Sequence, residues 1–289
     1  DRPTGQVIVF NGELYNFRAL RGDLEATGDR FDSSGDTEVL LRLLATRGPG
    51  ACARLRGMFA LGLWDEARRR LVLARDPLGI KPLYVAHNPD PEGGWRLAFA
   101  SEVRALLASG LLASTRLDPA ALASVVWSGF VAGPGTIVEG VESLGPGEAR
   151  TITQRAPGRG LEVEATTFWS PARRSEEAWA EATEGELRDA LHEALRLHLI
   201  SDVPTGVFLS SGVDSASVAN LAQRVSDAPV DTFTLAFEDQ GMSEGHDARR
   251  IADAIGSRHH EVVLTEARFV EQLERALGAL DQPTFDGLN

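Results

Sequence analysis

The feature that most constrains the fold is a change in the pattern of apolar residues partway along the 289-residue chain. Up to about Trp169, short β-branched and aromatic runs alternate with turn residues, which predicts antiparallel sheets with helices packed on them. From Glu184 onward, apolar strands alternate with amphipathic helices, which predicts right-handed crossovers and a parallel sheet. We therefore predict an α+β domain over residues 1–170 and an α/β domain over residues 171–289.

The first part carries five short runs of strand type and one clear helix. The helix is expected over residues 36–44, where Asp36 is a good N-cap candidate. The apolar run that begins at Val7 is expected to stop at Asn11-Gly12, because Asn-Gly between apolar residues is typical of a hairpin turn. The turn residues 76–79 are expected to join two of the strands. The five strand segments are residues 7–10, 58–64, 71–74, 83–86 and 97–100.

The second part repeats a strand and helix unit. An amphipathic helix is expected from Glu184, and another is expected over residues 246–255, where Gly256 is placed to end it. Short apolar strands are expected over residues 207–209, 232–237 and 262–264. Because each strand is followed by a helix, these strands are expected to run parallel.

The strongest chemical signal is the loop of residues 209–215, which lies between a predicted strand and a helix N-terminus. Ligands of parallel sheets bind outside the carboxyl ends of strands, where the first-turn amides and the helix dipole attract anions. Asp214 would repel a phosphate unless a divalent cation lies between them, which indicates Mg²⁺. The alternative is a well-capped helix start without a ligand. The local sequence leaves both open, but it lacks the Lys-Ser/Thr of a Walker A loop and the three glycines of a dinucleotide turn.

The charge balance and the apolar stretches exclude several classes of protein. The formal net charge is −13 and there is no basic stripe, so a nucleic-acid partner is not expected. The longest apolar stretch, residues 120–138, is broken by glycine and proline, so no membrane span is expected. The single cysteine, Cys52, rules out an internal disulfide. The chain begins at Asp1 instead of methionine and ends at Leu288-Asn289 with neither a helix stop nor a polar tail, so we expect it to be the middle of a longer protein.

Read as an ordered series, six segments resemble the glutamine-hydrolysing asparagine synthetases across nearly the whole chain. The resemblance implies an Ntn-type class II glutaminase domain followed by an ATP-pyrophosphatase synthetase domain of the PP-loop type. It further implies a cytoplasmic enzyme, and a homodimer is one possible assembly. The segments are VFNGELYN at 9–16, GDTEVL at 35–40, LRGMFA at 55–60, RDPLGIKPLY at 75–84, FASEV at 99–103 and LSSGVDS at 209–215.

The resemblance assigns roles in the first domain to four residues. Asn11 and Gly12 correspond to the oxyanion hole that stabilises the intermediate of glutamine hydrolysis. Glu13 and Asp36 correspond to the carboxylates that bind the α-amino group of glutamine. From the pattern alone, Asn11-Gly12 is a hairpin turn, an interpretation that the resemblance reverses, while Glu13 is an exposed turn charge and Asp36 is a helix N-cap.

In the second domain the resemblance implies an ATP site. Asp214 corresponds to a Mg²⁺ ligand, and Leu209 and Leu235 correspond to positions that contact the adenosine, although both fit a simple strand core equally well. The implied reaction adenylates aspartate, releases pyrophosphate, and then lets ammonia from glutamine displace AMP. The residues matched to the pyrophosphate loop are Ser210, Ser211, Gly212, Val213, Asp214 and Ser215.

The chain also departs from the family pattern. The nucleophilic N-terminal cysteine of the family would lie before Asp1, and Cys52 is expected to be a core residue that cannot replace it. The fragment alone is therefore expected to be inactive. Residues 281–287 differ from better-known asparagine synthetases near the expected acceptor site. The alternatives are a related amidotransferase acting on another carboxylate and a nucleotide-binding homologue without catalysis, while a β-lactam-forming relative is disfavoured by the four glutaminase residues.

A metal site at His259-His260 is not expected. Adjacent residues of a strand point to opposite faces of the sheet, so the two imidazoles cannot easily bind one ion.

Overall fold

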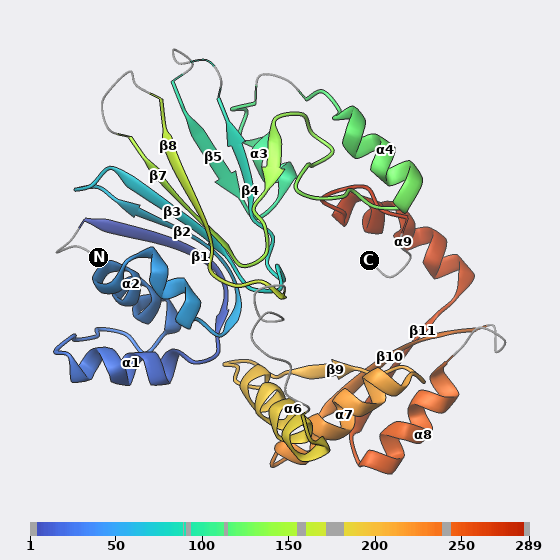
Figure 1. The fold of residues 1–289 in the computed structure, drawn as a ribbon. Coiled ribbons are helices and arrows are strands. Elements are labelled where there is room, and N and C mark those ends of the chain that lie inside the picture. Colours follow the sequence, from blue (N-terminus) through green and yellow to red (C-terminus); the bar gives the residue numbers. More distant parts are fainter. Residues whose placement is uncertain are drawn as a thin grey trace. The chain divides into compact units, whose positions relative to one another are not determined.

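The computed structural model describes residues 5–88, 90, 94–112, 115–154, 160–171, 182–238 and 244–285. The chain divides into two compact units, which are labelled by element in Figure 1. Unit 1 comprises Asp1–Trp179 together with Leu280–Asn289, and unit 2 comprises Ala180–Ala279. The domain limits at residues 170 and 171 stay a prediction. The division into compact units differs from these limits mainly because it places Leu280–Asn289 in unit 1.

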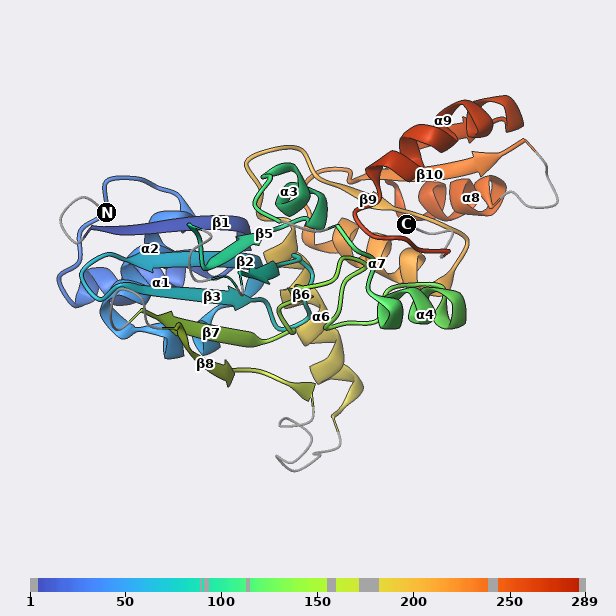
Figure 2. The same cartoon turned by 90° about the horizontal axis from the view of Figure 1, so that it is seen from above.

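Unit 1 contains two antiparallel sheets, as the spacing of its apolar runs predicts. The larger sheet has the strand order β1-β2-β3-β7-β8, and the smaller one has the order β5-β4-β6. Figure 2 shows the strands of the larger sheet side by side. The strands are β1 (Gln6–Leu14), β2 (Gly57–Asp65), β3 (Arg70–Arg75), β4 (Tyr84–His87), β5 (Leu97–Ala100), β6 (Val141–Ser143), β7 (Glu148–Thr153) and β8 (Glu162–Thr167).

Helices cover one face of the larger sheet, and the smaller sheet packs against the other. The main core joins β1, β2 and β3 to α1 (Phe17–Ala26), α2 (Asp36–Arg47) and the 3₁₀ helix η1 (Pro49–Arg54). A second core lies between the sheets and includes Leu73, Val85 and Leu144. β2 is consequently buried on both faces along its middle. Two further helices, α3 (Val103–Ala108) and α4 (Pro119–Ser128), follow β5.

One sequence prediction about the strands of unit 1 is wrong, and one about a turn is confirmed. Asn11-Gly12 is not a hairpin turn, because β1 continues through both residues to Leu14 and pairs with β2 along its whole length. The turn at residues 76–79 does form, since Gly79 N–H donates to the Asp76 carbonyl at 3.0 Å. It joins β3 and β4, which lie in different sheets and do not pair with each other.

Unit 2 contains the predicted parallel sheet, with strand order β11-β10-β9. On the middle strand, Thr232, Thr234 and Ala236 are buried beneath helices, and the intervening Phe233, Leu235 and Phe237 are exposed. No helix in the described residues combines the length and apolar character that crossing a membrane requires. The elements are α6 (Glu184–His198), β9 (Gly206–Phe208), α7 (Val213–Val225), β10 (Asp231–Phe237), α8 (Gly245–Ile255), β11 (Arg258–Leu264) and α9 (Glu266–Ala279).

Candidate functional site

The carboxyl-terminal half of β1 lies unusually close to β2. A Cβ atom at Gly12 would lie 2.1 Å from the Met58 carbonyl oxygen, and one at Gly57 would lie 2.2 Å from the Glu13 carbonyl oxygen. Contacts below 3.0 Å cannot be accommodated without moving the backbone, so each strand requires glycine where it meets its partner. The Asn-Gly pair therefore reflects close strand pairing in place of a turn.

Asn11 and Glu13 lie on the same face of β1, because residues two apart in a strand share a face. Both are exposed. Asn11 lines a pocket of about 260 Å³ whose walls also include Gly62 of β2 and Phe99, Ala100 and Ser101 at the end of β5. Among the described residues, no hydrogen-bond partner is seen for the Asn11 side chain. Its amide is therefore available to a ligand in the pocket.

Asp36 is not the N-cap of α2. Gly35 occupies that position, and the Asp36 carboxylate accepts a hydrogen bond from the Leu14 N–H at 3.0 Å. Asp36 thus binds the last residue of the strand that carries Asn11 and Glu13. The structure brings these three polar residues to one end of β1, where one Asp36 oxygen accepts from backbone and the other accepts from the Thr37 hydroxyl at 3.3 Å.

Arg75 and Asp76, which the sequence marks only as part of a turn and of a matched segment, organise the loop that follows β3. The fully buried Asp76 carboxylate accepts hydrogen bonds from four backbone amides, while Arg75 donates to the carbonyls of Gly79, Lys81 and Leu144. Burial lowers the pKa of the Arg75 guanidinium. The four amides bound by Asp76 belong to Phe59, Leu78, Ile80 and Lys81, at 2.9 to 3.2 Å.

Tyr15 directly follows the last residue of β1. Burial raises the pKa of the Tyr15 phenol, and the nearby carboxylates of Asp76 and Glu13 raise it further. Tyr15 is consequently a neutral hydroxyl donor at physiological pH. The adjacent Asn16 holds the chain before β2, because its amide donates to the Arg54 carbonyl and accepts from the Arg56 N–H. Apart from their place in the matched segment 9–16, nothing in the sequence indicates a role for Tyr15 or Asn16.

In unit 2, the loop of residues 209–212 leads from β9 into α7, with Gly212 as the N-cap. The hydroxyls of Ser210 and Ser215 share a hydrogen bond of 2.7 Å, and the Gly212 N–H donates to the Ser210 hydroxyl at 3.2 Å. The Ser211 N–H donates to a carboxylate oxygen of Glu244 at 3.1 Å. The loop therefore already binds one anionic oxygen through a backbone amide.

The first turn of α7 presents further amides to solvent. In the described residues, no acceptor is seen for the N–H groups of Val213, Asp214 and Ser215, which is the normal state of a helix start without a side-chain cap. Val213 and Asp214 are exposed. The alternative of a well-capped helix start is therefore wrong, because no described side chain caps α7 at Gly212. The hydroxyls of Ser210 and Ser215 bond to each other within the loop.

The two leucines matched to the adenosine site have different surroundings. Leu209 is buried beneath α7 and α8, and its carbonyl accepts from the Thr234 hydroxyl. Leu235 is about half exposed, so the strand-core interpretation is wrong for this residue.

Cys52 and the histidine pair behave as the sequence predicts. Cys52 is fully buried in the main core, and burial raises the pKa of its thiol to about 12. His259 faces Thr232 on the helix-covered side of the sheet, whereas His260 stacks on Phe233 on the open side and pairs with Asp231. The two imidazoles consequently point to opposite faces.

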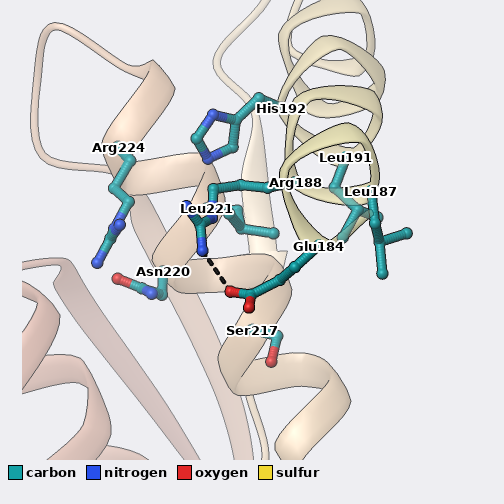
Figure 3. Close-up of a pocket in the computed structure, with 9 residues that line it drawn as sticks. All are labelled: Glu184, Leu187, Arg188, Leu191, His192, Ser217, Asn220, Leu221 and Arg224. Carbon is teal, nitrogen blue, oxygen red and sulfur yellow. Dashed lines mark hydrogen bonds and ion pairs between the residues drawn. The ribbon is translucent and has the colours of Figure 1, made fainter. Parts of the chain in front are cut away.

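A second pocket, of about 320 Å³, lies between α6 and α7 (Figure 3). Arg188 pairs with Glu184 at 2.5 Å along one wall, and Ser217, Asn220 and Arg224 line the other. None of the residues to which the resemblance assigns a role in binding or catalysis lines this pocket.

The comparisons with known proteins agree with the resemblance. The glutamine amidotransferase domain model matches residues 2–162, and the asparagine synthase model matches residues 186–288. The chain is similar to asparagine synthetase [glutamine-hydrolyzing] 1 of Bacillus subtilis, with 34% identity over 96% of this chain and 42% of the relative.

Two further relatives match this chain over a similar share of its length and of their own. A putative asparagine synthetase [glutamine-hydrolyzing] of Mycobacterium tuberculosis is 36% identical over 99% of this chain and 43% of the relative. Amidase chry2 of Gibberella zeae is 31% identical over 95% of this chain and 41% of the relative. The chain thus spans less than half the length of each of these three relatives.

Proposed function

The chain belongs to the glutamine amidotransferase family and continues into an asparagine synthase region, and from this premise we propose that it is the glutaminase domain and nucleotide-binding part of a glutamine-hydrolysing asparagine synthetase. Glutamine would supply ammonia in an Ntn-type unit 1, and an ATP-pyrophosphatase fold of the PP-loop type in unit 2 would activate a carboxylate. The observation that carries the proposal is the Asn11 side chain, which lines a pocket with no partner in the described chain. A cytoplasmic location and a homodimer stay predictions.

In the glutaminase half, Asn11 and the Gly12 amide would stabilise the oxyanion that forms on the glutamine carboxamide. Glu13 and Asp36 would bind the α-amino group, since two carboxylates suit an ammonium ion. Asp36 holds the end of β1 through the Leu14 N–H, and its second oxygen, which accepts from the Thr37 hydroxyl at 3.3 Å, would be the one offered to the substrate. The nucleophile has to come from elsewhere, because a thiolate at Cys52 is suppressed by burial.

In the synthetase half, residues 210–215 would bind the pyrophosphate of ATP. The fit rests on donors that the structure displays: the Ser211 amide binds a carboxylate oxygen, and the first-turn amides of α7 have no acceptor among the described residues. The acidic Asp214 lies exposed in that first turn, where it would hold Mg²⁺ through a carboxylate oxygen. Bound Mg²⁺ would neutralise phosphate charge. Leu209 and Leu235 would contact the adenosine.

The proposed reaction consumes glutamine, aspartate and ATP. A carboxylate oxygen of aspartate attacks the α-phosphorus, and the bond to the β-phosphate oxygen breaks to release pyrophosphate. Ammonia then attacks the activated carbonyl carbon, AMP leaves, and a proton from nitrogen is lost to solvent. Activation is needed because AMP is a far better leaving group than oxide.

The test uses the full-length protein that carries this chain. Asn11→Ala should lower the kcat of glutamine hydrolysis by about 10²- to 10³-fold, the usual effect of removing one oxyanion donor. Asn220→Ala removes a side-chain amide from the middle of α7 in unit 2, outside the residues proposed for glutamine hydrolysis, and is the matched control. Equal glutaminase activity in Asn11→Ala and wild-type protein would contradict the assignment.

A related amidotransferase is the second candidate. It is favoured by the similarity to a protein named as an amidase and by the divergence of residues 281–287, of which 286 and 287 lie outside the described ranges. Pyrophosphate release from ATP, measured with aspartate and then with other carboxylic acids, separates the two. Asparagine formed only with aspartate supports the first candidate. Pyrophosphate release with another acid alone supports the second, and release with none supports a non-catalytic homologue.

A further inference from the structure

The chain leaves α9 at Ala279, and the next six residues are bound to unit 1. Their first anchor is Asp281, which is half-buried at the start of α3. Its two carboxylate oxygens accept from the Val103 N–H at 2.9 Å and the Arg104 N–H at 3.0 Å. The first-turn amides of α3 are therefore capped from 178 residues away, and the local N-cap residue, Glu102, makes no capping bond.

Gln282 supplies a second anchor through both ends of its amide. Its oxygen accepts from the Ile137 N–H at 2.9 Å, and its nitrogen donates to the Tyr84 hydroxyl at 3.1 Å. The backbone adds a third anchor, because Thr284 forms an isolated bridge with Phe130. Five residues thus reach three separate parts of unit 1: α3, β4 and the segment after α4.

Two of the bound parts, α3 and β4, adjoin one wall of the pocket beside Asn11. Phe99, Ala100 and Ser101 line that pocket, and Ser101 lies two residues before Val103. Tyr84 is the register partner of Ala100 in the β4–β5 pair. Asp281 and Gln282 therefore act on the backbone that follows the pocket wall and on the strand next to it, without lining the pocket themselves.

We propose that Asp281 and Gln282 are positioning residues that tie the chain leaving unit 2 to the wall of the pocket beside Asn11. This inference rests on the function proposed for that pocket. The tie makes glutamine hydrolysis in unit 1 depend on the state of unit 2, since the anchored residues continue directly from α9. By linkage, the dependence is reciprocal for ligand binding.

The chain offers a matched control for Asp281. Asp118 caps α4 by the same chemistry, accepting from the Ala120 and Ala121 amides at 2.7 and 2.9 Å, but its helix begins at the next residue. Asp118→Ala and Asp281→Ala each remove two carboxylate-to-amide bonds. Only the second releases a distant segment of the chain.

The experiment compares both variants and Gln282→Ala in the full-length protein by two measurements. Hydrogen exchange of peptides covering residues 100–108 should become about tenfold faster in Asp281→Ala, as expected for losing a bond to a charged group, and should stay unchanged in Asp118→Ala. The ratio of glutamate released to pyrophosphate released should rise at least about twofold in Asp281→Ala and Gln282→Ala, because hydrolysis no longer follows unit 2.

The outcomes separate the two proposals. Unchanged exchange at residues 100–108 in Asp281→Ala would overturn the tie, whatever the enzyme does. Faster exchange with the glutamate-to-pyrophosphate ratio of Asp118→Ala would overturn the positioning role. Absence of glutaminase activity in the wild-type protein would instead overturn the proposed function and leave the exchange measurement to judge the tie.

Discussion

Replacing Asp76 by asparagine tests a cluster of four hydrogen bonds around a buried carboxylate in unit 1. One carboxylate oxygen accepts from the Leu78 and Ile80 amides, and the other accepts from the Phe59 and Lys81 amides. Asparagine keeps the shape of aspartate, but its amide nitrogen donates. Whichever way the side chain turns, one pair of backbone amides therefore loses its acceptor and faces another donor.

The magnitude follows from those two lost bonds. A hydrogen bond to a charged group contributes about 1.5–3 kcal/mol, and Asp76 is fully buried, so solvent cannot replace it. Losing two such bonds should lower the free energy of unfolding of unit 1 by about 3–6 kcal/mol. This is a large fraction of the roughly 5–15 kcal/mol that stabilises a typical domain.

Tryptophan fluorescence during urea unfolding measures this effect on unit 1 alone, because all five tryptophans lie within residues 1–179. Asp118→Asn is the control, since aspartate and asparagine are almost equally good N-caps and its two amide bonds share one oxygen. Asp118→Asn should change stability by less than about 0.5 kcal/mol. An Asp76→Asn protein as stable as this control would refute the claim that two buried backbone amides lose their acceptor.

Three further perturbations test other parts of the structure. Gly12→Ala places a Cβ 2.1 Å from the Met58 carbonyl oxygen and should lower stability by about 1–3 kcal/mol in the same urea assay, whereas Gly35→Ala meets nothing within 4 Å and should be nearly neutral. Cys52, with its buried thiol and a pKa of about 12, should react with a thiol reagent at neutral pH only as fast as unit 1 opens; rapid labelling of folded protein would contradict its placement. Burial lowers the pKa of the His259 imidazole in the folded protein. Its contribution to the free energy of unfolding is therefore fully present above the ordinary pKa of about 6.5 and is lost as the pH falls through the lowered pKa. An NMR titration midpoint of His259 at or above about 6.5 would contradict this expectation.

The fold of unit 2 was predictable because its signals are local. The alternation of 2-residue and 3.6-residue periods identifies β10 and α8, and Gly256 takes the left-handed conformation expected of a helix C-terminus. What the sequence could not show is that Leu235 is exposed. Alternation along β10 indicates which residues share a face, but not which face the helices cover.

In unit 1, the wrong predictions all concern bonds between distant segments. Asn11-Gly12 has the sequence of a turn, and only the close approach of β2 at Met58 explains why glycine occurs inside a strand. Asp36 has the sequence of an N-cap, but its carboxylate binds the Leu14 amide 22 residues earlier. Asp76 was visible within a matched segment, yet its four amide bonds depend on how β2 and the following loop meet.

The presence or absence of hydrogen-bond partners distinguishes structural from functional polar groups. In the described chain, Asp76 and Asp65 are buried, and their carboxylates are engaged with backbone amides or arginine side chains. Asn11 and the first-turn amides of α7 differ, because they have no partner among the described residues and lie exposed or at a pocket wall. Groups of the first kind gain stability from bonds that a ligand cannot improve. Groups of the second kind gain only when a ligand supplies the missing partner, so their removal should lower ligand binding and turnover while leaving the free energy of unfolding almost unchanged.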